Sequence, residues 1–425
     1  MAQQDFLIRE HVTGIVTEGT TGTHGGTPER LRVTNASLLN TGFGKEMHAD
    51  DAASPVRWDN PEHIAGRSLT KWGPLTIQLS GVKLADRLEE GVAVNVLSHD
   101  VLYQHIFGRR YAAAGTTVAG TGSTTTVVAL ASATGRKPGE LLAIETTAGI
   151  YEVRTLVTLS GTDATVHPAL STAPATNGLK VRGVRTFTMA ETHNTTVTLE
   201  QRLVVHSGTS YEYRALGAFR DSVTFTFGAF GVVPTIAMTG AAVEVQGPTA
   251  LASPAWALGS APAANDIDLP MTFYGQLLVD GANVRFEPGS FKVVMSTNAD
   301  PIGDGSKASG VGAFMETTGR DNGMSVSGEF TIRADSAEVT AFAAKTIRHM
   351  LLVIDPNRGS ATETMAVLEV PRFQVIEQPR ETTVGAGRGG YIIKWKGLMD
   401  TRVTALSDTA ENNDLARTPV RWGLV

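Results

Sequence analysis

The chain has 425 residues, a formal net charge of −6, 42% hydrophobic residues, 18% charged residues and no cysteine. Its length allows two or three domains of about 100–200 residues each, and its composition is that of a folded protein. The absence of cysteine excludes disulfides, thiolate metal sites and cysteine nucleophiles, and it fits assembly in a reducing cytoplasm. The weak negative charge, without a basic cluster, argues against a protein that grips nucleic acid.

The N-terminal residues do not have the pattern of a targeting segment. Residues 1–6 lack the basic and then apolar plan of a signal peptide. No apolar run reaches the roughly 18 residues that a membrane-spanning helix needs. We therefore expect no membrane partner for this chain.

The first part of the chain predicts two strands, a long polar loop and one helix. Residues 6–9 and 75–79 favour strands, and residues 35–67 between them form an irregular polar stretch. Apolar residues at helical spacing predict a short amphipathic helix over 97–107. We expect Ser98 or Asn95 to cap its start and Gly108 to end it.

Residues 112–185 change in character and predict a small inserted β domain. The segment begins with a Thr, Gly and Ser-rich stretch and then gives four short strands, at 125–128, 141–144, 151–154 and 164–166. Several short strands separated by turns within some 70 residues favour an antiparallel barrel or sandwich. The flanks at 112–115 and 173–178 have the composition of hinges.

The remainder of the chain predicts further strands and a second helix. Strands are expected at 196–205, 222–227 and 235–239, followed by a linker rich in Pro, Ala and Gly at 247–265. The last part predicts a helix over 337–350 and a long polar loop over 298–323. Its expected strands lie at 271–274, 290–295, 327–332, 365–370 and 391–396.

The order of these elements indicates an internal duplication. Each half runs from a long polar loop to a strand, a helix and then pairs of strands. The predicted domains are therefore a first unit of residues 1–111 and 186–246, an insert of residues 112–185, and a second unit of residues 266–425. The fold class is mainly β, with two tandem units that each carry a short flanking helix. We expect the two polar loops to contact neighbouring subunits and to become ordered on assembly.

No pattern in the sequence predicts catalytic, cofactor-binding or metal-binding residues. The segment 385–390 fits GxGxxG, but a strand follows it, whereas a dinucleotide site needs a helix N-terminus there. Asn298, Asp300 and Asp304 resemble a calcium loop whose fifth and twelfth positions hold Ile302 and Ser309.

Histidine and serine patterns give no site either. His99 and His105 are six residues apart, so they point to different sides of the helix. Neither HExxH nor GxSxG occurs. We therefore expect a protein that is not an enzyme and has no cofactor.

Several passages together resemble the major tail tube proteins of long-tailed, siphovirus-like bacteriophages. Residues 67–79 leading into the helix at 99–107 are similar to the strand and helix of that family. The strand 196–205, the hairpin and alternating strand at 211–225 and the closing segment 233–240 are similar to its later strands. The insert, notably at 138–141 and 168–170, resembles small β domains of other phage structural proteins. The resemblance covers most of the chain, but no single short signature carries it.

This resemblance implies a structural virion protein. Such proteins are β-sandwiches with a flanking helix, and their strands join those of neighbours into a barrel around a lumen. Rings then stack into a tube that delivers DNA to the host without binding it specifically. The implied partners are further copies of the chain, the tape measure, the tail terminator and the tail tip. The implied location is the virion, after assembly in the bacterial cytoplasm.

The duplication specifies the expected ring. Two units per chain predict a trimer with pseudo-sixfold symmetry, and one unit per chain would instead give a hexamer. A net acidic chain suits the passage of DNA because it repels phosphates. Two other interpretations remain open at this point: a capsid decoration protein or other virion protein, and a carbohydrate-binding or carbohydrate-cleaving β protein.

Overall fold

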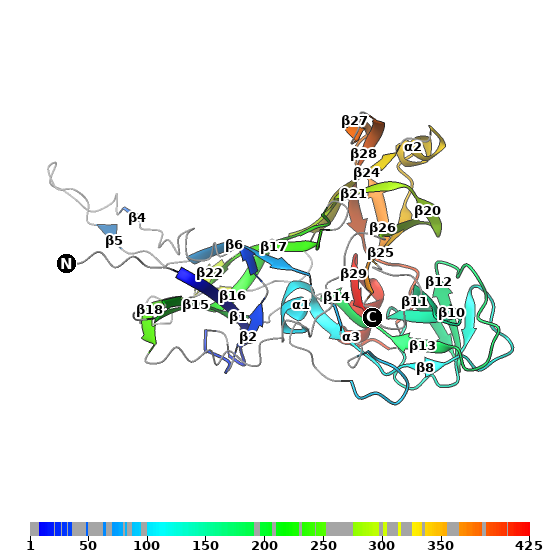
Figure 1. Ribbon diagram of the computed structural model, residues 1–425, viewed down its shortest axis with the longest axis horizontal. Coiled ribbons are helices and arrows are strands. Elements are labelled where there is room, and N and C mark those ends of the chain that lie inside the picture. Colours follow the sequence, from blue (N-terminus) through cyan, green and yellow to red (C-terminus); the bar gives the residue numbers. More distant parts are fainter. Residues whose placement is uncertain are drawn as a thin grey trace.

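The computed structural model is built mainly of β-strands, with three short helices among the residues it describes (Figure 1). These residues are 8–20, 22–26, 28–31, 33–35, 48–49, 63–64, 70–79, 81–82, 87–94, 100–190, 196–205, 210–228, 232–242, 244–251, 275–296, 301–303, 313–315, 325–333, 336–354, 365–384, 388–405 and 407–425. The mainly β fold class expected from the sequence is confirmed.

One sheet of eight strands, here called the long sheet, runs through both halves of the chain. In spatial order its strands are β3 (Val33–Asn35), β6 (Thr70–Gln78), β17 (Thr235–Ala242), β16 (Ser210–Thr226), β21 (Phe286–Ser296), β24 (Ser325–Arg333), β28 (Arg388–Leu398) and β27 (Arg380–Val384). All neighbours are antiparallel. Along these strands buried apolar residues alternate with partly exposed polar residues, because one face packs on a core and the other does not.

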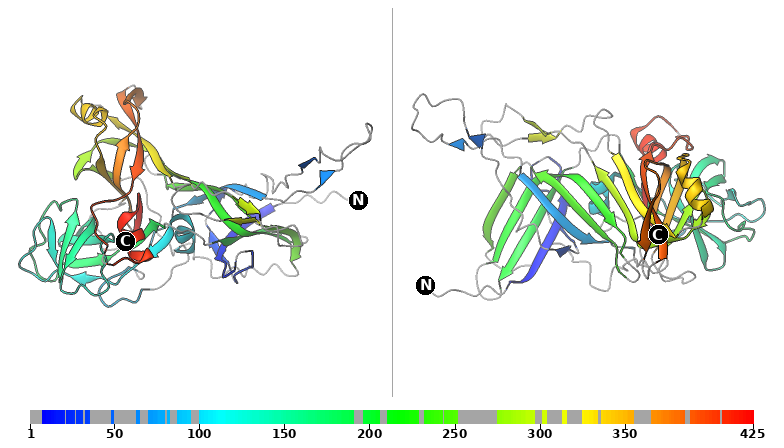
Figure 2. Two further views of the ribbon diagram at one scale, coloured as in Figure 1. Left: turned by 180° about the vertical axis from the view of Figure 1, so that it is seen from behind. Right: turned by 90° about the horizontal axis from the view of Figure 1, so that it is seen from above.

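The longest strand, β16, belongs to two sheets. Its second half pairs with β17 and β21, and its first half pairs with β18 (Glu244–Leu251) and with β15 (Val197–Val205). Beyond β15 lie β1 (Ile8–Thr17) and β2 (Glu29–Leu31). We call this second group, β2–β1–β15–β16–β18, the arm sheet. The right-hand view of Figure 2 shows its long strands lying side by side.

A second layer, here called the outer sheet, covers the apolar face of the long sheet. Its strands are β20 (Ala282–Val284), β19 (Gln276–Val279), β25 (Arg348–Ile354), β26 (Ala366–Val375), β29 (Arg421–Leu424), β14 (Arg185–Met189) and β7 (Gly108–Tyr111). The C-terminal strand β29 therefore lies between strands of the two halves.

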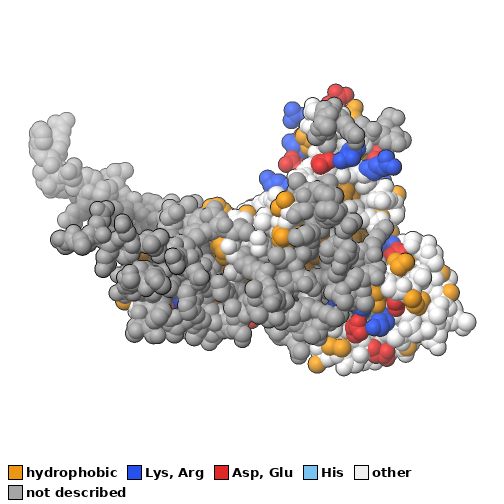
Figure 3. Space-filling model, in the orientation of Figure 1, with side chains coloured by type: hydrophobic (Ala, Val, Ile, Leu, Met, Phe, Trp, Pro, Cys, Tyr) orange, Lys and Arg blue, Asp and Glu red, His pale blue; other side chains and the backbone are white. Residues whose placement is uncertain are grey.

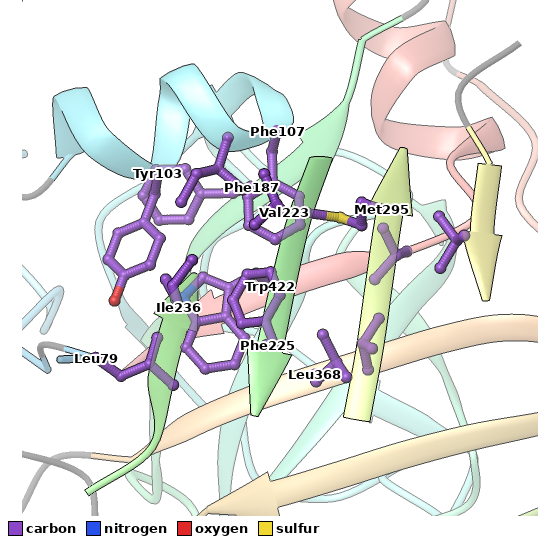
Figure 4. Packing of buried hydrophobic residues seen from close by; sticks show 14 of the residues in the cluster. Leu79, Tyr103, Phe107, Phe187, Val223, Phe225, Ile236, Met295, Leu368 and Trp422 are labelled. Carbon is purple, nitrogen blue, oxygen red and sulfur yellow. The ribbon is translucent and has the colours of Figure 1, made fainter. Parts of the chain in front are cut away.

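The main core lies between these layers. Figure 4 shows helix α1 (Asp100–Phe107) above the strands, with Tyr103 and Phe107 directed at Phe187, and with Trp422 beside Phe225. The ring centroids of Tyr103 and Trp422 are 6.0 Å apart. Aromatic side chains at such distances are stabilised by burial of large apolar area and by edge or offset contact. Helix α2 (Ser336–Ala343) adds Phe342 to the same core, next to Phe330.

The inserted segment forms a separate six-stranded sheet with its own core. In order its strands are β8 (Thr116–Thr117), β13 (Lys180–Gly183), β10 (Leu141–Thr147), β11 (Ile150–Ser160), β12 (Asp163–His167) and β9 (Val127–Ala129). A bridge between Val118 and Leu130 links the two ends, as in a small barrel. This sheet lies within the range 112–185 expected for the insert.

The insert packs on the outer sheet, on the face turned away from the main core. Leu141, Val153 and Val184 join a cluster of buried apolar residues with Leu351 and Val367 of the outer sheet. Helix α3 (Ala410–Arg417) makes a second contact, where Gly139 lies against the backbone of Leu415 so closely that a Cβ would stand 2.3 Å from its carbonyl oxygen. The flanks expected to be hinges therefore join a docked domain.

Both long polar loops contain a two-stranded ladder in their described residues. The first ladder pairs β4 (His48–Ala49) with β5 (His63–Ile64), and the second pairs β22 (Pro301–Gly303) with β23 (Ala313–Met315). The first loop precedes β6, and the second precedes β24.

The second predicted helix is wrong in its C-terminal half. The expected helix at 337–350 ends with α2 at Ala343, and Arg348–Ile354 form strand β25 instead. Lys345 has a φ of 52°, which stops the helix, and β25 then pairs with both β19 and β26. Pairing in the middle of a sheet outweighs the helical spacing of Val339, Phe342 and Ile347.

Other predicted boundaries also differ from the structure. The expected linker at 247–265 begins inside β18, whose residues pair with β16, and positions 252–265 lie outside the described residues. The expected strand at 271–274 and the capping residues Ser98 and Asn95 also lie outside them. Helix α1 starts at Asp100 and ends before Gly108, whose φ of 101° suits glycine. Helix α3 and strands β8, β13 and β29 had no prediction.

Candidate assembly surface

The polar face of the long sheet is rich in hydroxyl side chains. On this face β16 and β17 carry Ser222, Thr224, Thr235 and Thr239, which alternate with the buried core residues. The side chains of all these residues are partly exposed. Small hydroxyl side chains carry no charge, so this part of the face offers hydrogen-bonding groups without attracting or repelling phosphate strongly.

Charges on the polar face gather in the half built by the second part of the chain. One register row crosses six strands and consists of Gln78, Thr235, Thr226, Lys292, Glu329 and Lys394. A neighbouring row runs through Ser327 and Lys396 to Gln374 of β26. Figure 3 shows Lys, Arg, Asp and Glu side chains gathered at the end of the molecule with α2, β27 and β28. The described part of this face is therefore not acidic, although the chain is.

Each half of the long sheet contains a cross-strand pair of tryptophan and glycine. Trp72 on β6 lies opposite Gly240 on β17, and Trp395 on β28 lies opposite Gly328 on β24. A Cβ at Gly240 would stand 2.6 Å from the ring of Trp72, and one at Gly328 would stand 2.4 Å from the ring of Trp395. The glycine makes room for the indole, which covers it in return. In the first half the glycine is on β17, which follows the tryptophan strand β6 along the chain. In the second half the glycine is on β24, which precedes the tryptophan strand β28.

The two halves also follow the same order of elements. Strand β6 leads into α1 and β7, and β24 leads into α2 and β25. Strand β17 then pairs with β6, as β28 pairs with β24. The insert stands between the paired strands β7 and β14, which correspond by their order to the paired strands β25 and β26 of the second half. Residue identity gave little sign of this correspondence, and the sheet register supplies it.

The long sheet ends at β3 on one side. At the other end, β28 pairs with β27 along its first residues and with β26 of the outer sheet along its last residues, so the two sheets join there. Strands β3 and β27 each pair on one side alone among the described residues. Strand β3 pairs with β6, and β27 pairs with β28. Arg380, Glu381 and Thr383 of β27 are exposed. An unpaired edge presents a row of backbone N–H and C=O groups that can bind another strand.

A buried charge cluster fixes the C-terminal strand and the outer sheet. Arg421 donates to Glu369 at 2.8 Å and to Asp400 at 3.0 Å, and all three side chains are fully buried. Arg402 contacts the same two carboxylates. Burial opposes ionisation of Glu369, but Arg421, His349 and Arg402 outweigh it and hold the pKa of this carboxyl well below its usual range. The cluster therefore remains ionised at neutral pH.

A second charge cluster lies on the arm sheet. Arg202 contacts Glu200 at 2.6 Å and Glu212 at 3.0 Å, and Arg214 contacts the same two carboxylates. His24 lies 3.2 Å from Glu200. Burial and the hydrogen bond from Glu212 raise the pKa of Glu200 to about 7. The raised pKa follows from burial and from two carboxyl groups sharing one position.

The motifs weighed in the sequence do not come together as a site. Residues 388–390 of the glycine-rich segment form the start of β28, so a strand follows it as expected. Asn298, Asp300, Asp304 and His99 lie outside the described residues. His105 is buried in α1. Within the part of the chain that the structure describes, no three His, Asp or Glu side chains are grouped as metal ligands.

Comparison with known proteins gives this chain no family. No protein-family model matches the sequence, and no curated protein matches it. No helix among the described segments has the length and apolar character needed to cross a membrane.

Proposed function

We propose that this chain is a structural subunit that joins head to tail with its own copies into rings, and that the rings stack into a phage tail tube. The observation that carries the proposal is the long sheet. It consists of two sets of four strands joined in series, with one polar face. Its end strands β3 and β27 each pair on one side alone among the described strands, while the last residues of β28 pair with β26 of the outer sheet.

The join inside the chain suggests the join between chains. Strand β16 is the last strand of the first set, and it pairs with β21, the first strand of the second set. By its place in the element order β27 corresponds to β16, and β3 corresponds to β21. A second copy that set its β3 against β27 would repeat the internal join. Such heterologous contacts continue until the rotation closes them into a ring.

Three chains would close a ring of the expected size. Each chain supplies eight strands, so three supply 3 × 8 = 24. At about 4.8 Å per strand, this circumference corresponds to a diameter of about 37 Å between backbones, and strand tilt widens it. Barrels with far fewer strands already enclose water-filled channels. The ring would therefore have a lumen that inward side chains do not fill.

The polar face would line this lumen, because the other face is occupied by the core. Its hydroxyl-rich half suits passing DNA, since uncharged groups neither release counterions nor repel phosphate. Lys292, Lys394 and Lys396 would add weak, salt-dependent attraction, partly offset by Glu329. The acidic lumen expected from the net charge is therefore not part of this proposal. The outer sheet and the insert would lie outside, and the protein would reside in the virion.

Engineered crosslinks test the proposed join without interference, because the chain has no cysteine of its own. The test variant carries Asn35→Cys on β3 and Thr382→Cys on β27. Oxidation of assembled protein should give covalent trimers in denaturing gels without reductant. The matched control carries Thr382→Cys with Ser160→Cys, an exposed position on β11 of the insert, and should remain monomeric.

Two outcomes would contradict the proposal. Covalent hexamers would replace the three-chain ring with a six-chain ring. Protein that stays monomeric at high concentration, and that binds only to phage heads, would favour a decoration protein.

A further inference from the structure

The insert meets the body of the protein at a pair of histidines. His167 is the last residue of β12 in the insert, and His349 lies in β25 of the outer sheet. Their rings meet edge to face, with centroids 4.8 Å apart. Gly281, in the turn between β19 and β20, lies close to Pro168 beside this pair. The contact thus closes one corner of the interface between the insert and the outer sheet.

His349 is already bound to the buried charge cluster. Its Nε2 lies 3.0 Å from Oε1 of Glu369, and its backbone N–H donates to Asp280 at 2.8 Å. The ring of His349 is therefore held in place by its contact with Glu369. His167 belongs to the insert, which has its own sheet and its own core.

Charged groups face His167 from several elements. Directly around it are His349 on β25, Glu369 on β26, and Asp400 and Arg402 after β28. Behind these, Arg421 of β29 pairs with both carboxylates, and Asp280 of the β19–β20 turn pairs with Arg348. On the insert, Arg154 precedes Thr155, the residue opposite His167 on β11, and pairs with Glu152. Arg402 and Arg421 balance the buried carboxylates of Glu369 and Asp400. A proton on His167 would therefore add a positive charge that has no counterion there.

A cavity of about 610 Å³ adjoins this corner between the insert and the β19–β20 hairpin. Its walls include Glu152, Arg154 and Ser171 from the insert, and Asp280 and Asn283 from the hairpin. Glu152 accepts from Ser171 and Arg154, and Asp280 accepts from Arg348. The acidic and basic groups of the walls are thus paired within the protein, and the cavity offers no isolated charge to hold an ion. The cavity separates part of the insert from the β19–β20 hairpin at this corner.

We propose that His167 is an acid-sensitive latch that holds the insert docked on the outer sheet while neutral and releases this corner when protonated. Release separates His167 and Pro168 from His349 and Gly281, and it opens the adjoining cavity. The insert stays attached through its two chain connections. This inference does not depend on the proposed assembly, because the interface lies within one chain.

The direction of the effect follows from linkage. Burial, with His349 and Arg402, lowers the pKa of His167 to about 4 from the value of about 6.5 for a free histidine. A histidine whose pKa is lowered in the docked state stabilises docking above its free pKa, and this stabilisation is lost as the pH falls towards 4. With a pKa of about 4 in the docked state and about 6.5 in the released state, lowering the pH from 8 to 5 shifts the docking equilibrium towards release by about 30-fold. Above pH 7 the equilibrium should not depend on pH.

Hydrogen exchange followed by mass spectrometry tests the latch in the full chain. At pH 5, after correction for intrinsic rates, exchange in the β19–β20 hairpin should accelerate by up to about 30-fold relative to pH 8. Amides of β10 in the insert core should remain protected, which separates release from unfolding of the insert. His167→Gln should remove the acceleration, and the matched control His24→Gln, on the arm, should retain it.

A second variant keeps the test decisive if His167→Gln docks poorly. His349→Gln removes the facing imidazole and should reduce the acid response without abolishing it. The latch is overturned if the wild-type hairpin exchanges equally at both values of pH. It is also overturned if His167→Gln shows the full response of the wild type.

Discussion

At the scale of single residues, Glu369 holds the most consequential buried charge in the outer sheet. It accepts from Arg421 and His349 and contacts Arg402, and its side chain is fully buried. A buried guanidinium that loses one carboxylate partner is costly, because water cannot replace it. This cluster could not be predicted from the sequence, because its members lie far apart along the chain and fit no spacing rule.

Glu369→Gln should therefore destabilise the protein by about 3 kcal/mol or more. The pKa of Glu369 lies below its unfolded value, so its contribution is present above the unfolded pKa and is lost as the pH falls. The variant should accordingly lose less stability than the wild type on acidification. Urea unfolding at pH 7 and pH 4 measures both effects. Glu377→Gln, which breaks the exposed pair with Lys394, should change stability by less than about 0.5 kcal/mol; an equal loss in the two variants would refute this account.

At the scale of elements, alternation along the chain predicted most strands of the long sheet. The expected strands at 235–239, 327–332 and 391–396 lie within β17, β24 and β28. These strands face a core on one side and solvent on the other, so apolar and polar residues alternate along them with a period of two. Residues 348–354 are buried on both faces and show no such period, which is why β25 was predicted in part as helix.

Other elements could not be predicted from local pattern. Helix α3 carries mostly polar residues and is fixed by contacts with the insert and with Arg421, which donates to the carbonyls of Leu415 and Ala416. Strand β29 has four residues and exists because β14 and β26 leave a position between them. The pairing that joins the two halves, β16 with β21, is likewise a matter of register between distant segments.

The tryptophan–glycine pair of the second half gives a test at this scale. Gly328→Ala would set a Cβ 2.3 Å from the carbonyl oxygen of Lys292 and 2.4 Å from the ring of Trp395. We expect a loss of about 1–3 kcal/mol, because neither backbone nor packed indole can move away cheaply. Chemical denaturation measures it. Gly389→Ala on β28, where nothing lies within 4 Å, should alter stability by less than about 1 kcal/mol; a similar loss there would show that strand glycines matter for another reason.

At the scale of the whole molecule, the long sheet is both the support of the core and the proposed joining surface. Most antiparallel sheets of this length protect or cover their edges. Here the sheet ends in β3 and β27, each paired on one side among the described strands. The insert packs on the far side of the outer sheet. An architecture with the insert on one side, and with β3 and β27 each paired on one side alone among the described strands, suits a subunit that is joined in series.

Electron microscopy of the purified, assembled chain tests the central claim most directly. The account predicts rings or tubes with three chains per ring, with the long sheets forming a continuous barrel of 3 × 8 = 24 strands around an open lumen. Within that barrel β27 of each chain should pair with β3 of the next. Rings of six chains, or particles in which the polar face of the long sheet is turned away from the lumen, would contradict it.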